Sequence, residues 1–444
     1  MAFLRVPFKL LFMNQRHKAI ISLYEKYLNS TGVCTDTRQI KEGCLFFALK
    51  GPNFNANSFA QEALKKGAKY AIIDEAEYST GDRCVLVEDS LKTLQILANH
   101  HRKQLDIPFV AITGSNGKTT TKELTLAVLS KKYKVLATKG NLNNHIGVPL
   151  TLLSIDRTVE IAIIEMGANH LGDIAELCEI AEPTHGIITN IGRAHIGEFG
   201  GVENIIRGKS ELYHYLIQNK GHAWINSNHA VLKNMSKRFT APSFYPNNGD
   251  DYTCELISIS PFVSYRSMNS EEVDTQLIGQ YNFENIATAL AIGHTFEVSE
   301  ADANLAISNY YPDNNRSQVV KKGSNTYILD AYNANPSSMA VAITNIAQMD
   351  SAQKVLILGD MYELGEDSDA EHRKIGELLK NKIFTQVYFC GELIKESLIT
   401  YPAGKFFKDK MELAKEVKQQ NYSDTLFLLK ASRGIGLEKI IDKI

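Results

Sequence analysis

A glycine-rich stretch carries the clearest chemistry in this sequence. Gly114–Thr119 follows an apolar run that predicts a buried strand, Phe109–Thr113, and a helical pattern begins directly after it. Glycines let backbone N–H groups approach phosphate oxygens, and the N-terminus of a helix favours an anion. In such a loop Lys118 would reach the β- and γ-phosphates of a nucleotide, and the Thr119 hydroxyl would bind Mg²⁺. The residues predicted to bind the nucleotide here are Gly114, Asn116, Gly117, Lys118, Thr119 and Thr120.

The spacing of this loop narrows the class of enzyme. In the common phosphate-loop pattern a glycine stands five residues before Gly117, whereas here that position is Ile112. The shorter stretch Thr113–Thr120 argues against an ordinary GTPase or motor ATPase. A glycine-rich turn from strand to helix that binds no ligand is the alternative interpretation.

Three further polar residues fall where an α/β sheet binds ligands. Glu165 ends an apolar run, His195 follows the run Gly186–Asn190, and Lys209 comes shortly afterwards. Open α/β sheets bind ligands at the carboxyl ends of their strands, and Mg²⁺ prefers oxygen ligands that it shares with phosphates. Glu165 beside Thr119 would suit that ion. Taken singly, each residue also has a structural interpretation: a solvated or capping carboxylate, a structural histidine and a surface lysine in an ion pair.

Short apolar runs separated by helical stretches surround these residues and predict an α/β fold with a largely parallel sheet. We expect three domains in series: an N-terminal α/β domain over residues 1–106, a central ATP-binding domain over 107–311 and a C-terminal domain over 312–444. Ligands would lie in clefts between the domains. The predicted strands are Leu45–Leu49, Tyr70–Ile73, Cys84–Val87, Phe109–Thr113, Lys134–Thr138, Ile161–Glu165, Gly186–Asn190, Ala223–Asn226, Thr326–Asp330, Lys354–Leu358, Gln386–Cys390 and Thr425–Leu429, and a predicted helix covers Phe59–Lys66.

Composition bounds the remaining possibilities. The 444 residues are 44% hydrophobic and 22% charged, and the formal net charge of -2 offers no basic balance for binding nucleic acid or an anionic membrane. The six cysteines form no C-x-x-C pair, so we expect reduced thiols in a cytoplasmic protein rather than a disulfide framework. Met1–Met13 is too short and too interrupted by charge to span a bilayer, and Met13 is a second candidate start. We expect a monomer without stable membrane insertion.

The loop and the three polar residues together resemble the Mur ligase superfamily, which includes folylpolyglutamate synthetase. The resemblance implies a P-loop-type central domain, a Rossmann-like C-terminal domain and an ATP-dependent ligase with two Mg²⁺ ions. Thr119 and Glu165 would hold the first ion, and His195 and Lys209 would support the second. It also implies that Lys209 is carbamylated, because an ammonium group cannot bind a metal whereas a carbamate presents carboxylate-like oxygens.

Motifs across nearly the whole chain resemble one branch of this superfamily, the UDP-N-acetylmuramoyl-tripeptide–D-alanyl-D-alanine ligases. Asn141–Pro149 resembles the substrate loop of that branch, and Asp330–Met339 resembles its most specific signature. Leu358–Gly365 and Lys430–Arg433 resemble parts of its C-terminal domain. The implied substrates are ATP, UDP-MurNAc-tripeptide and D-alanyl-D-alanine, joined through an acyl phosphate.

The resemblance also assigns residues to the ligands. Asn282 and Asn285 share one helical face at i, i+3 and would meet the adenine, while Arg316 and Asp330 would reach ATP from the C-terminal domain. A guanidinium at Arg38 would match the diphosphate of the uridine nucleotide. The implied substrate-binding residues are Thr37, Arg38, Asn141, Asn144, Tyr332, Asn333, Asn335, Ser432 and Arg433.

The sequence departs from the family pattern in two places. Tyr281 stands where the family usually has histidine, and Asn55–Asn57 stands where it usually has Asp-Gly-His.

The competing hypotheses are a superfamily ligase that adds the third peptide residue or extends folate with glutamate, and a nucleotide-binding regulator without catalysis. Whether the third residue of the peptide is diaminopimelate or lysine, and whether the domains are open or closed, stays undecided at this level.

Overall fold

The computed structural model describes residues 8–193 and 196–444, and for residues 8–17 it describes the course of the backbone. Within these ranges the protein has the predicted α/β fold. The chain forms two compact units. One holds the chain up to Ala111 with Lys134–Gly167 and Asp173–His185, and the other holds Ile112–Tyr133, Ala168–Gly172 and Gly186–Ile444.

A small parallel sheet and three helices form the N-terminal part of the first unit. These elements are α1 (Phe8–Leu28), β1 (Val33–Cys34), β2 (Leu45–Phe47), α2 (Ala60–Lys65), β5 (Tyr70–Ile73), β6 (Cys84–Leu86) and α3 (Ser90–Arg102). The strand order is β1-β2-β5-β6, and each neighbouring pair is parallel. Helix α2 can pack closely because alanines such as Ala60 and Ala63 lie in its contact with Ile73. Helix α3 begins after Asp89, whose carboxylate accepts a hydrogen bond from the Lys92 N–H.

The rest of the first unit supplies two strands and the helices that pack near them. These elements are β8 (Val135–Ala137), α5 (Gly147–Leu152), β9 (Ile161–Glu165) and α6 (Asp173–Ala181), and β8 pairs with β9 in parallel. Strand β9 is buried along its whole length, as an apolar run in a covered parallel sheet should be. Glu165 is therefore a carboxylate at the end of a fully buried strand.

The second unit contains the predicted phosphate loop and the helices around it. Its elements include β7 (Phe109–Thr113, which begins in the first unit), α4 (Lys118–Leu129), β10 (His185–Ile188), α7 (Ile196–Phe199), α8 (Val202–Gln218), β11 (His222–Asn226), β12 (Ser243–Tyr245) and α10 (Gln280–Thr295). Four of these strands are neighbours in one sheet, in the order β12-β11-β10-β7.

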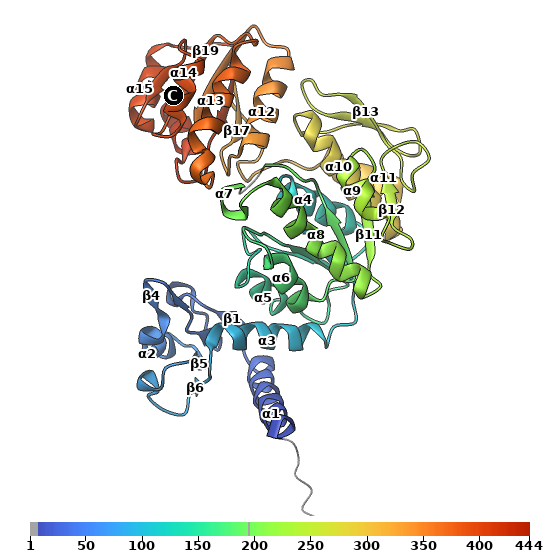
Figure 1. Ribbon diagram of the computed structural model, residues 1–444, viewed down its shortest axis with the longest axis vertical. Helices are drawn as coiled ribbons and strands as arrows, with labels where there is room; N and C mark the ends of the chain where they lie inside the picture. The colour runs from blue at the N-terminus through green and yellow to red at the C-terminus, as the bar shows by residue number, and fades with distance from the viewer. Residues whose placement is uncertain (1–7, 194–195) are drawn as a thin grey trace, which may run out of the picture. The chain divides into compact units, whose positions relative to one another are not determined.

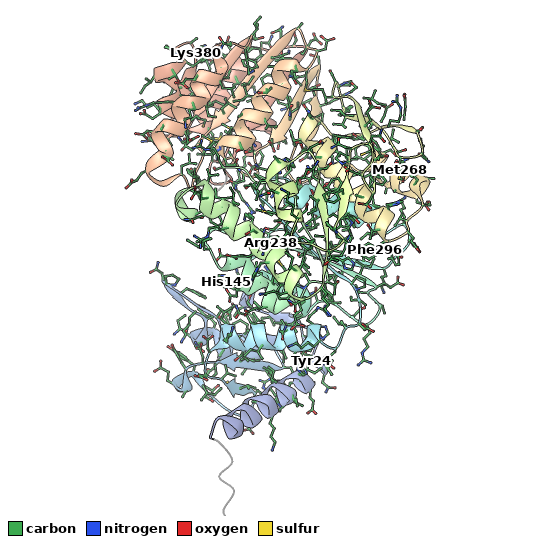
Figure 2. All side chains as sticks on the ribbon, turned by 45° about the vertical axis from the view of Figure 1, so that its right-hand side comes forward. Tyr24, His145, Arg238, Met268, Phe296 and Lys380 are labelled. Atoms are coloured by element: carbon green, nitrogen blue, oxygen red, sulfur yellow. The ribbon has the colours of Figure 1, made fainter. Side chains whose placement is uncertain are left out.

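Helix α10 lies directly against α4. The two can approach because a glycine stands at the contact: a Cβ on Gly293 would lie 2.5 Å from the Val128 side chain. Phe296, labelled in Figure 2, follows the last residue of α10. Its carbonyl accepts a hydrogen bond of 2.8 Å from the Tyr133 hydroxyl. The Trp224 indole donates to the Thr295 hydroxyl at 2.8 Å, which also ties β11 to this helix.

A second six-stranded sheet lies in the C-terminal part of the chain (Figure 1). It contains β16 (Gln318–Lys322), β17 (Asn325–Asp330), β18 (Gln353–Gly359), β19 (Gln386–Cys390), β20 (Lys405–Phe407) and β21 (Thr425–Lys430), in the order β16-β17-β21-β18-β19-β20. Only the edge strand β16 pairs antiparallel among these described strands.

Helices cover both faces of this C-terminal sheet. Val355 and Phe427 share a buried cluster with Leu413 of α15 (Lys410–Gln419) and with η6 (Leu437–Lys443). Side chains alternate along a strand, so Leu356, next to Val355 on β18, faces the other side of the sheet and is also buried. Helix α12 (Pro336–Gln348) contacts β21 and packs against α13 (Ser368–Leu379). The parallel strands are apolar on both faces because both faces are covered. Polar side chains therefore stand at the carboxyl ends of the strands.

The predicted strands are confirmed, with ends shifted by one or two residues in most of them. The sequence reading missed α1 and the small antiparallel sheet of β13 (Glu255–Ser258), β14 (Ser264–Arg266) and β15 (Glu272–Asp274). Three or four residues with mixed exposure are too few to show a clear period. Among residues 8–193 and 196–444, no helix has the length and hydropathy that crossing a bilayer requires.

Candidate functional site

The predicted phosphate loop has the backbone of an anion-binding turn. It joins the end of β7 to the start of α4, and Gly117 is the N-cap residue of α4 with a φ of 80°. Only glycine adopts that left-handed conformation readily. Gly114 also has a positive φ, of 143°, and a Cβ there would overlap the Thr189 hydroxyl and lie 3.0 Å from the Thr189 nitrogen. Both glycines are therefore required by geometry.

The segment that follows β10 holds the phosphate loop in place. The backbone of Asn116 donates to the side-chain oxygen of Asn190 at 3.0 Å and accepts from the Thr189 hydroxyl at 2.6 Å. The Ser115 hydroxyl accepts from the Gly192 N–H at 2.8 Å. These bonds make the loop and residues 189–192 one hydrogen-bonded body.

Lys118 lies over the mouth of this loop. Its ammonium group donates to the carbonyl oxygens of Gly114 at 2.7 Å and Ser115 at 3.3 Å, and the side chain is half-buried. Thr119 is buried in the first turn of α4, and Thr120 is half-buried beside it. The loop thus presents a lysine cation at the N-terminus of a helix, the combination that binds nucleotide phosphates.

Helix α10 supports the loop through two buried asparagines. The Oδ1 atom of Asn285 accepts from the Thr121 hydroxyl at 3.0 Å, and a Cβ on Gly117 would overlap that oxygen. Asn285 Nδ2 donates to Asn282 Oδ1 at 2.9 Å, and Asn282 donates in turn to the Ile278 carbonyl at 2.8 Å. The shared helical face is confirmed, whereas the adenine contact of these amides stays a prediction.

The signature segment of the C-terminal sheet reaches the same loop. Asn335 is the N-cap of α12, and its Nδ2 donates to the Oδ1 of Asn116 at 2.8 Å. Ser337, two residues later, accepts a hydrogen bond of 3.0 Å from the Arg193 N–H. Arg193 also pairs with Glu371 of α13 at 2.7 Å. Predicted nucleotide-binding and substrate-binding residues therefore touch each other although they are far apart in sequence.

Other signature residues gather at the carboxyl ends of the C-terminal strands. The guanidinium of Arg316 stacks 3.8 Å from the centre of the Tyr332 ring, and that of Arg433 lies 5.1 Å from the same ring. Asp330 and Lys430 are register partners on β17 and β21 and form an ion pair at 2.6 Å. Lys430 also donates to the Asn333 carbonyl, at 3.3 Å. Asp330 is thus already held by a buried lysine, which sequence reasoning did not assign to the site.

Two buried side chains, Asp360 and His372, hydrogen-bond the backbone of loops in the C-terminal part of the chain. Burial raises the pKa of the Asp360 carboxyl above its ordinary value, and the Asp360 side chain accepts from the Ile394 N–H at 2.8 Å. Burial lowers the pKa of His372, whose Nε2 accepts from the Met361 N–H at 3.0 Å. Ser432 accepts from the Tyr362 N–H, also at 3.0 Å. Ser432 therefore orders the neighbouring loop, while its substrate contact stays a prediction.

Tyr281 occupies one of the positions where the family pattern is broken. Its hydroxyl hydrogen-bonds the Ser317 hydroxyl, and its pKa is raised by burial and by the charge of Asp330. The phenol is therefore neutral. This hydrogen bond links the first turn of α10 to Ser317, which lies just before β16. The tyrosine at position 281 provides the hydroxyl for it.

Two of the candidate metal residues other than Thr119 can be placed, Lys209 and Glu165. Lys209 of α8 is buried, with its ammonium group 3.3 Å from the Ala168 carbonyl oxygen and 5.3 Å from the centre of the Phe199 ring. His195 lies outside the described residues. Glu165 is buried at the end of β9, and its Oε1 accepts from Asn143 Nδ2 at 2.8 Å. The described residues hold no cluster of three or more His, Cys, Asp or Glu side chains that could bind a metal.

Asn143, whose side chain contacts Glu165, was not among the predicted site residues, although it stands in the predicted substrate loop. The predicted Asn144 has a local task, because its Oδ1 accepts from the N–H groups of Ile146 at 3.2 Å and Gly147 at 2.9 Å at the start of α5. Asn141 is exposed. A run of three asparagines in four positions was the available signal, but which of them faces the carboxylate depends on the fold.

The predicted uridine-nucleotide residues lie at the N-terminal sheet. Arg38 is 85% exposed and makes hydrogen bonds to Asp36, which lower the pKa of that carboxyl to about 2. Thr37 is the first residue of the short helix η1 (Thr37–Gln39). Asn57, at the second broken position, is buried and donates to Asp74 Oδ1 at 2.7 Å. At this position, where the sequence departs from the family pattern, the asparagine side chain thus makes a structural hydrogen bond within the N-terminal part of the chain.

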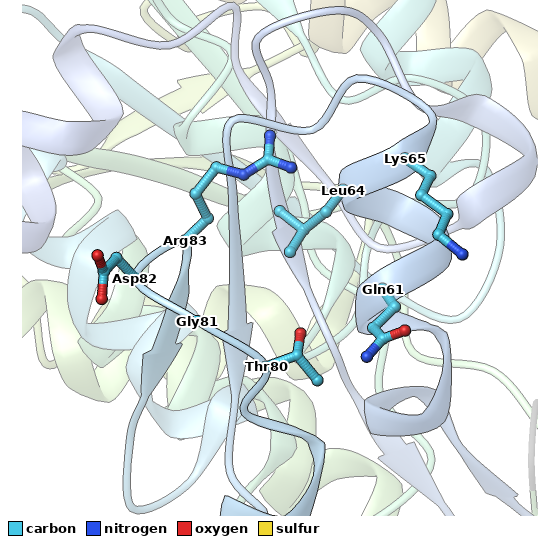
Figure 3. Close-up of a pocket in the computed structure, with 7 residues that line it drawn as sticks. All are labelled: Gln61, Leu64, Lys65, Thr80, Gly81, Asp82 and Arg83. Atoms are coloured by element: carbon cyan, nitrogen blue, oxygen red, sulfur yellow. The ribbon is translucent and has the colours of Figure 1, made fainter.

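A surface pocket of about 330 Å³ also opens on the N-terminal part, between α2 and the turn before β6 (Figure 3). Arg83 and Lys65 supply its positive charge and Asp82 a negative one. Its lining contains none of the predicted site residues: it consists of Gln61, Leu64, Lys65, Thr80, Gly81, Asp82 and Arg83.

Comparison with known proteins places this geometry in a family. The Mur ligase middle domain matches residues 112–293, and the Mur ligase glutamate ligase domain matches residues 315–433. The UDP-N-acetylmuramoyl-tripeptide–D-alanyl-D-alanine ligase of Bacillus subtilis is 33% identical over 424 residues, which cover 92% of this chain and 92% of the relative. The chain belongs to the Mur ligase family.

Solved structures agree with this assignment. A crystal structure of MurF from Acinetobacter baumannii superposes on this Mur ligase with a TM-score of 0.84 at 29% identity, covering 92% of each chain. MurF ligase from Thermotoga maritima in complex with ADP has a TM-score of 0.83 at 28% identity and covers 94% of this chain and 97% of its own. The resemblance inferred from motifs is therefore confirmed at the level of the family and the fold.

Proposed function

We propose that this Mur ligase uses ATP to join UDP-MurNAc-tripeptide to D-alanyl-D-alanine, which gives a UDP-MurNAc-pentapeptide, ADP and phosphate. The observation that carries the proposal is the contact of Asn335 with Asn116 at 2.8 Å, which brings the branch-specific signature to the phosphate loop. Similarity along 92% of the chain to a ligase of that name supports the same reaction.

The phosphate loop would carry out the first half of the reaction. Backbone N–H groups of residues 114–119 and the ammonium of Lys118 would bind the β- and γ-phosphates. The terminal carboxylate of the tripeptide attacks the γ-phosphorus, and ADP leaves. Lys118 already lies beside the loop carbonyls, so it needs to turn outward to meet the developing phosphate charge.

The second half forms the amide bond. The amine of D-alanyl-D-alanine attacks the carbonyl carbon of the acyl phosphate, the amine nitrogen loses a proton, and inorganic phosphate leaves. Residues of the C-terminal strand ends, such as Tyr332, Asn333 and Arg433, would bind the dipeptide and the nucleotide sugar. An acyl phosphate hydrolyses in water, so this step requires that the site exclude solvent.

The residues proposed for Mg²⁺ have suitable chemistry. Thr119 would contribute a hydroxyl and Glu165 a carboxylate, both buried oxygen donors of the kind that Mg²⁺ prefers. Lys209 is buried, and as a carbamate its oxygens would serve a second ion with His195. Bound Mg²⁺ would neutralise charge on the transferred phosphoryl group.

The proposal includes the domain limits 1–106, 107–311 and 312–444. The family matches to residues 112–293 and 315–433 lie inside the second and third of these. Asn282, Asn285, Arg316 and Asp330 keep their proposed roles around ATP, and we propose a cytoplasmic monomer.

The test is ADP release by the full-length protein with ATP, Mg²⁺ and UDP-MurNAc-tripeptide, in parallel with and without D-alanyl-D-alanine. Tripeptides ending in diaminopimelate and in lysine are both supplied. We expect turnover that requires the dipeptide, and a pentapeptide product by mass spectrometry.

Other outcomes are equally informative. If ADP is released only with free amino acids, or with glutamate and a folate, the proposed substrates are wrong, whereas the ATP-dependent ligase reaction still holds. ATP binding without turnover on any acceptor would contradict the enzyme and favour a nucleotide-binding regulator.

A further inference from the structure

We propose that Arg193 and Glu371 are positioning residues: their ion pair holds the N-terminus of α12, with Asn335, in register against the phosphate loop. The inference rests on the proposed function and deepens it, because it identifies what aligns the signature segment with the nucleotide. The pair joins residues that are 178 positions apart in sequence.

The first contact is set by a helix cap. Asn335 Oδ1 accepts from the Ser338 N–H at 2.9 Å, and the Ser338 hydroxyl accepts from the Asn335 N–H at 3.1 Å. Because this capping box occupies the oxygen of the amide, its nitrogen must face the other way. That nitrogen donates to Asn116 Oδ1. The start of α12 is thus aimed at the phosphate loop by its own cap.

The second contact is stronger. Arg193 donates from its backbone to the Ser337 hydroxyl and from its guanidinium to Glu371, at 3.0 Å and 2.7 Å. The Glu371 side chain is only 4% exposed, and Lys374 also contacts it, at 2.8 Å. A charge-assisted bond to a carboxylate this buried is stronger than one at the surface.

The two contacts belong to rigid bodies on each side. Residues 189–192 and the phosphate loop are joined by the bonds of Thr189, Asn190 and Ser115, and Arg193 continues that segment. On the other side α12 packs against α13, which carries Glu371. Loss of the ion pair would therefore loosen the register of Asn335 and the strand-end residues near it, without removing any group proposed to touch a substrate.

The test compares Arg193→Ala with a matched control, the change of another exposed arginine to alanine on α13, the helix that carries Glu371. Arg373 of α13 pairs with Glu396 at 2.6 Å and is 45% exposed, close to the 43% of Arg193, but that pair lies wholly within the C-terminal region. We expect Arg193→Ala to lower kcat about ten- to thirtyfold, the worth of a hydrogen bond to a charged group. KM for ATP should change less than threefold, and Arg373→Ala should match wild type.

A double-mutant cycle separates this pair from general destabilisation. If the two residues act through each other, Arg193→Ala with Glu371→Ala together should lower kcat no further than the worse single change. Arg193→Lys, which keeps the charge, should recover part of the loss. Additive effects, or an equal loss in Arg373→Ala, would overturn the proposal.

Hydrogen exchange gives a readout that does not need turnover. The backbone amides of Asn335 and of residues 337–339 should exchange about tenfold faster in Arg193→Ala than in wild type or Arg373→Ala. If wild type shows no turnover, the proposed function fails while the exchange result still decides the inference. Unchanged exchange together with unchanged kcat would refute it.

Discussion

Replacing Gly117 with alanine tests the geometry of the phosphate loop most directly. Gly117 is the N-cap of α4 and has a φ of 80°, a conformation that alanine adopts only at a cost. The added Cβ would also overlap Asn285 Oδ1. That oxygen cannot simply turn aside, because it accepts from Thr121 while the amide nitrogen donates to Asn282.

The free energy by which Gly117→Ala should destabilise the observed loop conformation has two parts. A left-handed alanine costs about 1–2 kcal/mol relative to an allowed backbone. Moving Asn285 breaks its bonds of 3.0 Å and 2.9 Å, which contribute about 1 kcal/mol each. The sum is about 3 kcal/mol. If the loop relieves this strain by leaving its phosphate-binding conformation, affinity for ATP should fall about a hundredfold.

The assay is displacement of a fluorescent ATP analogue, with Gly323→Ala as the matched control. Gly323 also has a positive φ, of 61°, but nothing lies within 4 Å of a Cβ there. The control therefore carries the backbone cost alone, at a site distant in sequence from the loop, and its ATP affinity should equal that of wild type. Wild-type affinity in Gly117→Ala, or an equal loss in the control, would refute the argument.

Three further predictions concern the metal, the pH dependence and the carbamate. Asn143→Ala removes the donor to Glu165, so the Mg²⁺ concentration for half-maximal ADP release should rise about tenfold, and an unchanged titration would contradict the role of Asn143. Burial lowers the pKa of His372 from 6.5, so below that pH the unfolded chain binds a proton that the folded chain does not. The free energy of unfolding should therefore fall by up to about 1.4 kcal/mol per pH unit down to the folded-state pKa, and denaturant titrations should show a flatter profile for His372→Gln. Chelation of Mg²⁺ should abolish turnover, and carbonate-free buffer should lower it until bicarbonate is restored, with a ¹³C carbamate signal that is absent in Lys209→Ala; its presence in that variant would place the carbamate elsewhere.

The local parts of the site were predictable because they depend on neighbours in sequence. An apolar run, two glycines and a helical pattern specify the turn from β7 to α4, whatever surrounds it. Short apolar runs likewise specify buried parallel strands, and parallel strands bring their carboxyl ends to one edge. Glu165 and Asp330 could be placed at such edges from the sequence for this reason.

The sequence by itself thus determined the α/β fold, the phosphate loop and, through its motifs, the family. Only the tertiary structure decided the partners: Asn285 beneath Gly117, Asn143 on Glu165, and Asn335 on Asn116. Two of these pairs join residues more than a hundred positions apart, and no periodic pattern records which amide faces which oxygen. Such contacts depend on how strands and helices pack and on which atom a cap leaves free, and those are properties of the folded chain.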